Sequence, residues 1–501
     1  MGLKRNISAN YFGAGWNALM TMAFVPLYIR YLGIEAYGLI GIFAMLQGLF
    51  SLLDLGMAPT ISREMARLKS GVNENQTARN LLRSVELIAV CAALTMTVGL
   101  WTASSWLARD WLMAKGLSIS VMVHALEIMS CLIGLRIIDN IYRSALIGLQ
   151  RQVLLNLIIS VAATLRGLGA LAVLAYLSNS IQAFFLWQLV VSWISIAMLS
   201  IATYSVFPGV KGRATFSVQA LKNIGRFAAG TMAITCLSLL LGNMDKILLS
   251  KLLPLGVFGY YAFAVVVAQT PLGLVAPIAQ AFYPRFTQLH SRDDREALIS
   301  AYHSATQLVT VLLGAATVFM ILFGHEALDI WTRNAVLSRR IYALAAVLSV
   351  GSLFNGLMTI PYYLQLSSGW TGLTVRINLF AIVLVVPALF VLVPEYGAMA
   401  AAWVWLALNA FYFIVTIPLM HRRLLPQEKW RWYIQDVTIP LIVTFAMGWL
   451  LRALLPTFAG NFQNIGVLIV SAFLLVMSAA SAAPIIRRRV LKVFGLDRIT
   501  I

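Results

Sequence analysis

Residues 26–67, PLYIRYLGIEAYGLIGIFAMLQGLFSLLDLGMAPTISREMAR, decide how the chain is organised. They contain the end of one apolar segment, a short turn at residues 32–35, and a second apolar segment that closes among charged residues. A fainter copy, KLLPLGVFGYYAFAVVVAQTPLGLVAPIAQAFYPR, occupies residues 251–285 and places Gly38 on Gly259. The order of apolar segments around both copies also repeats. We therefore predict two halves built on one repeated pattern.

The composition indicates a membrane protein. Hydrophobic residues make up 60% of the 501 residues and charged residues only 11%, which is too little polar surface to cover a soluble protein. Apolar runs of about 20 residues, the length that crosses a bilayer as a helix, recur along the whole chain. Barrel strands would instead alternate over about 10 residues. The sequence therefore predicts an all-α, polytopic membrane protein.

Hydropathy and length predict about fourteen transmembrane helices. They lie near residues 10–30, 37–59, 82–107, 118–143, 153–176, 181–206, 227–250, 257–283, 301–323, 341–364, 372–393, 396–420, 434–455 and 463–484.

These helices group into four predicted regions. The first six form an N-terminal lobe at residues 1–206, and a cytoplasmic linker follows at residues 207–226. The next six form a C-terminal lobe at residues 227–420. Residues 421–501 add the last two helices and a basic tail. Six spans in each lobe would give the two lobes the same orientation in the membrane, as parallel repeats require.

The net charge of +19 sets the predicted orientation. The basic residues gather in short connectors on alternate sides of the apolar runs, as the positive-inside rule describes. This distribution predicts that both termini are cytoplasmic, and it argues against a nucleic-acid partner.

No pattern of catalytic residues is visible. The chain has no nucleophile elbow, no HExxH and no CxxC, and its five histidines are dispersed. All three cysteines fall inside apolar runs, which makes a disulfide framework or a metal site unexpected: they are Cys91, Cys131 and Cys236. We predict that the protein is not an enzyme and holds neither metal nor cofactor. Coupling to a proton or sodium gradient stays open.

Charged and amide side chains inside the spans are the candidate site residues. A charge at bilayer depth costs roughly 2.5–3.5 kcal/mol and therefore needs a partner or a watery cavity. The candidate substrate-binding cations are Arg30, Arg136, Arg166, Lys246 and Arg376. The candidate partner or coupling acids are Asp54, Glu127, Asp139 and Asp245, and the polar cavity candidates are Asn17 and Asn243.

Two interpretations of these charges stay open: neutralised packing pairs, or the lining of a hydrated cavity. Arg136, Asp139 and Arg143 are spaced i, i+3 and i+7 and so share one helix face. Arg166 has no acid one turn away on its own helix. Its partner would have to come from the preceding span, where Glu127 and Asp139 are the candidates, or it would face a cavity.

Several short motifs carry a resemblance to a known family. They are YLG at 31–33, YG at 37–38, DLG at 54–56, GNMDK at 242–246 and GVFGY at 256–260. Together with the order of spans over residues 1–420, they resemble the Wzx-type polysaccharide flippases. That family belongs to the MOP superfamily, which also holds the MATE drug exporters and the lipid II flippase MurJ.

The resemblance implies a fold and an activity. The fold would be two six-helix lobes related by a pseudo-twofold axis along the membrane normal, with an extra pair of helices. The activity would be to flip an undecaprenyl-diphosphate-linked oligosaccharide, such as an O-antigen unit of lipopolysaccharide, from the cytoplasmic to the periplasmic leaflet of the bacterial inner membrane. The implied partners are that lipid-linked substrate, membrane lipid and the polymerase or assembly proteins of polysaccharide biosynthesis.

Two other functions stay open at this point. A cation-coupled multidrug exporter of the same fold would need an acid-rich cavity, whereas the candidates here include several cations. An integral-membrane glycosyltransferase or polymerase would need a sizeable external loop or a catalytic acid or histidine pair there, and the sequence shows neither.

The orientation can be tested with a reporter that is active only after export. We expect activity when it is fused after Val336, because residues 333–340 are predicted to be external. A fusion after Ser70, in a predicted cytoplasmic loop, is the control and should be inactive. A cytoplasmic signal at residue 336 would contradict the fourteen-helix topology.

Overall fold

The fold comes from a computed structural model, which describes residues 3–50, 61–62, 65, 72–206, 240–370, 372–455 and 463–493. The following predicted features lie outside these residues: Asp54 with the end of the second span and the DLG motif, the linker at residues 207–226, Cys236, the first part of the seventh span and the end of the basic tail. Within the described residues every regular element is a helix, and the only extended pairing is an isolated bridge between Met113 and Pro254. The all-helical prediction is confirmed.

The chain divides into two compact units, Met1–Ala262 and Phe263–Ile501. The boundary falls inside α9. The first unit contains α1 (Leu3–Leu32), α2 (Ile34–Phe50), α4 (Val72–Trp106), the π turn η2 (Leu107–Trp111), α5 (Ile119–Gly148), α6 (Gln152–Tyr176), α7 (Ile181–Tyr204), a helical stretch at residues 240–252 and the start of α9 (Leu255–Gln269).

The second unit begins with the rest of α9 and ends with a helical hairpin. Its further elements are η3 (Thr270–Leu274), α10 (Val275–Ser291), α11 (Arg295–Thr332), α12 (Ala335–Ser367), α13 (Gly372–Tyr396), α14 (Ala398–Phe411), η4 (Tyr412–Thr416), α15 (Ile417–Leu424), α16 (Lys429–Arg431), η5 (Trp432–Thr438), α17 (Ile439–Leu454), α18 (Gln463–Ala482) and α19 (Pro484–Val493).

Twelve helices in the described residues are long and apolar enough to cross a membrane. They correspond to twelve of the fourteen predicted spans. The second predicted span corresponds to the shorter apolar helix Ile34–Phe50, and the seventh begins outside the described residues. Three helices begin with an N-cap residue whose side chain accepts a hydrogen bond from a backbone N–H of the first turn: Ser118, Ser180 and Asp294.

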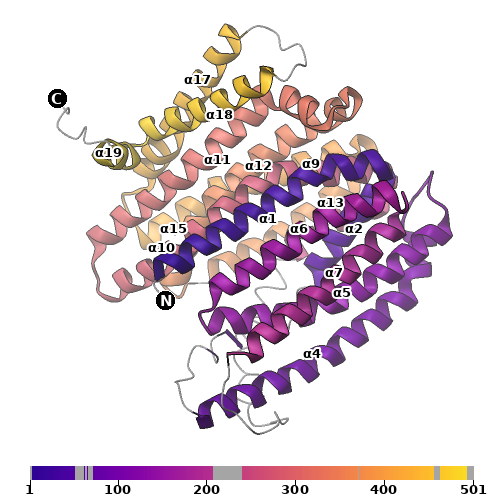
Figure 1. The fold of residues 1–501 in the computed structure, drawn as a ribbon. Coiled ribbons are helices and arrows are strands. Elements are labelled where there is room, and N and C mark those ends of the chain that lie inside the picture. The colour runs from indigo at the N-terminus through magenta and orange to yellow at the C-terminus, as the bar shows by residue number, and fades with distance from the viewer. Residues whose placement is uncertain are drawn as a thin grey trace. The chain divides into compact units, whose positions relative to one another are not determined.

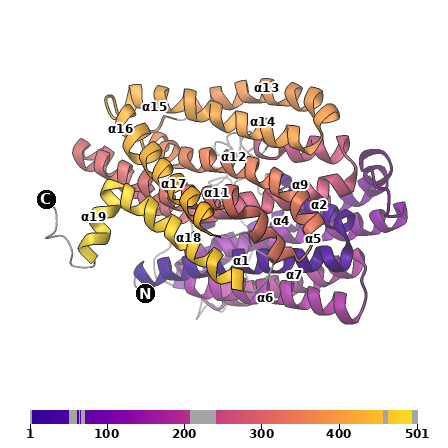
Figure 2. The ribbon, with the colours of Figure 1, turned by 90° about the horizontal axis from the view of Figure 1, so that it is seen from above.

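Neighbouring helices pack along much of their length inside each unit. In the first unit α5 lies between α4 and α7, and α6 lies between α1 and α7 (Figure 1). In the second unit α11 is the central helix and contacts α10, α12, α17 and α18 (Figure 2). The fully buried core around α11 includes Phe286, Tyr302 and Trp432. Almost every long helix therefore buries one face and leaves another free.

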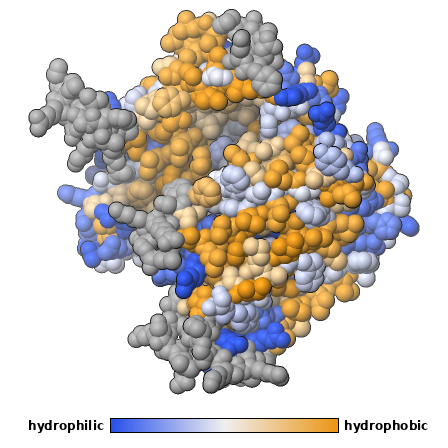
Figure 3. Space-filling model, viewed as in Figure 1, coloured by the Kyte–Doolittle hydropathy of each residue, from blue (hydrophilic) through white to orange (hydrophobic). Residues whose placement is uncertain are grey.

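The free faces are apolar, as contact with lipid requires. On α13, Leu379, Phe380, Val383 and Leu384 are all more than half exposed. On the visible face of the space-filling view, hydrophobic residues cover the lengths of the helices and hydrophilic residues gather toward the margins (Figure 3). Because lipid tails solvate such side chains, this surface fits a bilayer better than water.

Glycines allow α2 and the start of α9 to touch within the first unit. A Cβ on Gly38 would lie 2.5 Å from the carbonyl oxygen of Leu255, and one on Gly41 would lie 2.6 Å from Cβ of Ala262. A Cβ on Gly259 would collide with the carbonyl of Ile34. Gly38 and Gly259 are the two residues that the repeat pattern aligns. Small residues permit this backbone approach, which is a common way to pack membrane helices.

The glycine contact predicts a position-specific effect on stability. Gly38→Ala and Gly259→Ala should lower the melting temperature of the purified protein in detergent, because overpacking costs about 1–3 kcal/mol. Gly256→Ala, on the same helix as Gly259, should leave it unchanged or raise it, since the nearest atom to its added Cβ lies 3.9 Å away and alanine favours the helix. Equal melting temperatures for the variants at positions 38 and 256 would contradict the contact.

Candidate functional site

A buried carboxylate on α5 is the centre of the charged cluster in the first unit. Asp139 is 4% exposed. Nη1 of Arg136 lies 3.4 Å from its Oδ2, and Nε of Arg143 donates to the same oxygen. Ser195 on α7 donates its hydroxyl to Oδ1 at 3.0 Å. Arg136, Asp139 and Arg143 thus occupy one face of α5, as their spacing predicts.

The two arginines hold Asp139 differently. The Arg143 side chain is 15% exposed and reaches both carboxylate oxygens. The Arg136 side chain is 47% exposed and makes the longer contact. Arg143 is therefore the main buried counter-charge, while Arg136 keeps much of its guanidinium free for another anion.

Arg166 on α6 adds a third guanidinium to this region. Its charge interacts with those of Arg136, Asp139 and Arg143. Among the described residues its side chain makes no hydrogen bond or ion pair, while its backbone carbonyl accepts from Tyr28 and Gln188. Glu127 forms no ion pair with it in this part of the structure. Three guanidinium groups beside one carboxylate leave the region with a net positive charge.

A cavity opens next to Arg136. It has a volume of about 330 Å³ and lies between α2 and α5. It is lined by Ala44, Gln47, Gly48, Phe50, Ile133, Arg136, Ile137 and Asn140. Asn243 borders Gly48, since a Cβ on that glycine would lie 3.3 Å from the Asn243 amide oxygen. Amide groups and one cation therefore face a space large enough for a polar ligand group.

The other candidate residues are placed as follows. Lys246 bonds Asp245 at 3.2 Å and the carbonyl of Gly242 at 3.1 Å, and Tyr261 donates to Asp245 at 2.6 Å, so this pair is internally satisfied. Arg30 and Asn17 on α1 are exposed. Arg376 is exposed on α13 in the second unit. The structure thus brings Arg136, Asp139 and Arg166 together, with Asn243 at the border of the cavity beside Arg136.

The first unit contains another buried acid, which is not among the candidate site residues. Glu86 on α4 is 5% exposed and accepts hydrogen bonds from Tyr142 at 2.9 Å and Tyr204 at 2.7 Å, with Arg83 at 3.2 Å. Its partners lie on α4, α5 and α7. The i, i+3 spacing of Arg83 and Glu86 was the only local signal, because the two tyrosines come from distant parts of the chain.

The second unit has a larger cavity of a different kind. It has a volume of about 690 Å³ and lies between α11, α12 and α17. It is lined by Thr317, Val318, Ile321, Val350, Leu353, Phe354, Leu441, Ile442, Phe445, Ala446 and Trp449. Because this lining is almost entirely hydrocarbon, the cavity suits an acyl or isoprenoid chain and not a charged group.

Comparison with known proteins places the chain in a family. The family model described as "Polysaccharide biosynthesis protein" matches residues 3–290. The chain belongs to this polysaccharide biosynthesis protein family. The predicted resemblance is confirmed, and the family is one of transporters and not of enzymes.

Relatives and solved structures agree with this family assignment. A Shigella flexneri protein, whose name proposes a role as an O-antigen transporter, is 22% identical over 408 residues, which cover 81% of this chain and 94% of that protein. An inward-facing MATE multidrug transporter of the MOP superfamily has a TM-score of 0.69 at 15% identity, covering 81% of this chain and 94% of its own. The lipid II flippase MurJ in an inward closed conformation has a TM-score of 0.67 at 13% identity, covering 96% and 98%.

The unequal roles of the two α5 arginines in this family member can be measured. Arg143→Gln should destabilise the purified protein strongly, because breaking a buried ion pair costs about 3–5 kcal/mol. Arg136→Gln should cost at most about 1 kcal/mol, as half-exposed pairs do. The measurement is the thermal unfolding midpoint in detergent. Equal losses would show that the two arginines compensate Asp139 to the same extent.

Proposed function

We propose that the protein is a flippase that moves an undecaprenyl-diphosphate-linked oligosaccharide from the cytoplasmic to the periplasmic leaflet of the bacterial inner membrane. The family, the O-antigen transporter relative and the fold shared with MurJ all support a lipid-linked glycan as substrate. The observation that carries the proposal is the cationic cavity of the first unit, where the half-exposed Arg136 lies near an unbonded Arg166.

The cavity chemistry fits a diphosphate. A diphosphate keeps its negative charge as it crosses a region where an unpaired ion is costly. Guanidinium groups stay ionised and bind phosphate oxygens with two parallel hydrogen bonds. The cavity amides of Gln47 and Asn140 add hydrogen-bonding groups of the kind that sugar hydroxyls use.

Exchange of partners explains how Arg136 would bind and release the substrate. Its contact with Asp139 is long, at 3.4 Å, while Arg143 and Ser195 remain on that carboxylate. A phosphate can therefore bind Arg136 in place of Asp139, because Arg143 and Ser195 still compensate that carboxylate. When the phosphate leaves, the ion pair between Arg136 and Asp139 forms again. Neither the substrate-bound nor the substrate-free state then contains a buried, uncompensated charge. This suits a carrier, which must both bind and release its substrate.

The apolar cavity of the second unit supports a lipid substrate. A polyprenyl chain needs a hydrocarbon surface, which the side chains between α11, α12 and α17 provide.

The cation-coupled drug exporter is the weaker candidate, because the positively charged cavity of the first unit would repel cationic drugs.

Arg166 is the residue that tests the proposal. Arg166→Ala should abolish surface polysaccharide while the protein reaches the membrane at its normal level, and Arg166→Lys should keep part of the activity, since the charge survives and the planar fork is lost. Arg151→Ala, which changes an exposed arginine just before the same helix, is the matched control and should be fully active. The measurements are surface polysaccharide and membrane abundance of each variant.

Two outcomes would remove Arg166 from the substrate path. One is full surface polysaccharide in the Arg166→Ala strain. The other is low abundance of Arg166→Ala that is rescued by also changing Asp139→Asn, because such a rescue marks a packing pair.

A further inference from the structure

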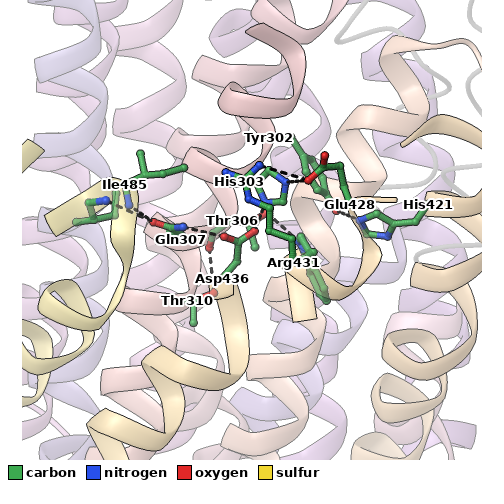
Figure 4. A network of polar contacts seen from close by, with 12 residues as sticks. Tyr302, His303, Thr306, Gln307, Thr310, His421, Glu428, Arg431, Asp436 and Ile485 are labelled. Carbon is green, nitrogen blue, oxygen red and sulfur yellow. Dashed lines mark hydrogen bonds and ion pairs between the residues drawn. The ribbon is translucent and has the colours of Figure 1, made fainter. Parts of the chain in front are cut away.

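A network of buried polar side chains joins α11 to the C-terminal hairpin of the second unit (Figure 4). His303 on α11 is fully buried, with Nδ1 against Oδ2 of Asp436 and Nε2 2.8 Å from Oε2 of Glu428. Gln307, one turn further along α11, donates to the other oxygen of Asp436 at 2.7 Å. The same glutamine accepts the backbone N–H of Ile485 at 2.8 Å.

This network ties together elements that are distant in sequence. Glu428 immediately precedes α16, Asp436 belongs to η5, and Ile485 lies in the first turn of α19. Nearby, Trp432 donates its indole N–H to Thr306 on α11 at 3.1 Å. Both ends of the hairpin formed by α17 and α18 are therefore held to one face of α11.

The hydrogen-bond arrangement around His303 requires an additional proton. An ionised carboxylate only accepts hydrogen bonds, and a neutral imidazole has a single N–H. Both ring nitrogens of His303 face carboxylate oxygens, so two hydrogens are needed where the neutral ring supplies one. The second hydrogen must be an added proton, carried either by the ring or by one of the acids.

His421, which contacts the neighbouring Tyr302, shows the opposite arrangement. Its Nδ1 lies 2.9 Å from the carbonyl oxygen of Ile417 and must donate to it. Its Nε2 lies 3.3 Å from the hydroxyl of Tyr302, which can donate to that nitrogen. A neutral His421 therefore satisfies both contacts with no added proton. Of these two histidines, His303 is the one that needs an added proton.

The charged and titratable groups near His303 come from four elements. They are Tyr302 on α11, His421 on α15, Glu428, Lys429 and Arg431 at α16, and Tyr433 and Asp436 on η5. Arg431 is half-exposed and lies 3.5 Å from Glu428. Among the described residues, no charged side chain of α10, α12, α17, α18 or α19 makes a hydrogen bond or ion pair with His303, Glu428 or Asp436.

We propose that His303, Glu428 and Asp436 form a proton-binding site that latches the C-terminal hairpin onto α11. With the proton bound, both carboxylates are held by the imidazole ring. When the proton leaves, a ring lone pair faces one carboxylate, and the contact on that side becomes repulsive. Glu428 is the side that opens, because it is 17% exposed and beside Arg431, whereas Asp436 is fully buried and held by Gln307.

The latch predicts that the start of the hairpin loosens as the pH rises. The measurement is hydrogen–deuterium exchange of the purified full-length protein, corrected for the intrinsic pH dependence of exchange. Protection of residues 428–438 should fall roughly tenfold or more between about pH 6 and about pH 9, because a hydrogen bond to a charged group is lost. His325→Gln changes a histidine on α11 that packs on Tyr342, outside the network, and should behave like the wild type.

Glu428→Gln separates a proton site from ordinary packing. The introduced amide can donate to Nε2 of His303 while Nδ1–H donates to Asp436, so both contacts form without an added proton. We therefore expect this variant to fold, to be protected at both pH values and to lose the pH dependence. The same pH dependence in Glu428→Gln as in the wild type would overturn the proposal. Wild-type protection that does not change over this range would overturn it as well.

Discussion

Compensation of charge inside the membrane is the constraint on which the rest of this structure depends. Lipid offers no hydrogen bonds, so each buried carboxylate must find its donors within the protein. Asp139, Glu86, Asp245 and Asp436 all do so, each with at least two side chains around it. Most of these donors lie on other helices, and the acids therefore act as cross-links that fix how helices pack. Arg166 differs from these acids, because its guanidinium makes no hydrogen bond or ion pair with any of the described residues.

Helix α2 relates the tight packing of the first unit to its cavity. Near its start, Gly38 and Gly41 bring its backbone against α9, so that no space remains between the two helices. Near its end, Gln47 and Gly48 line the cavity beside Arg136. One helix of 17 residues thus forms a closed contact at one end and a polar opening at the other.

The sequence predicted what depends on local pattern and missed what depends on tertiary packing. Long apolar runs predicted the helical membrane fold because span length is set by bilayer thickness. The i, i+3, i+7 spacing placed Arg136, Asp139 and Arg143 on one face because helix geometry is fixed. His303 and Asp436, however, are 133 residues apart, and no periodicity connects them. The neighbourhood of Arg166 likewise required the packing of α5 against α6 and α7.

The length of α11 has a consequence for the network at its beginning. Its 38 residues span about 57 Å at 1.5 Å per residue, well beyond the roughly 30 Å of hydrocarbon in a bilayer. In a bilayer centred on α11, His303, only eight residues from the helix start, would lie close to the lipid headgroups. Anionic headgroups create a surface potential of about −30 mV, which concentrates protons roughly threefold over the bulk. If the proposed latch binds a proton, the lipid composition of the leaflet, and not only the bulk pH, would therefore affect how often it is closed.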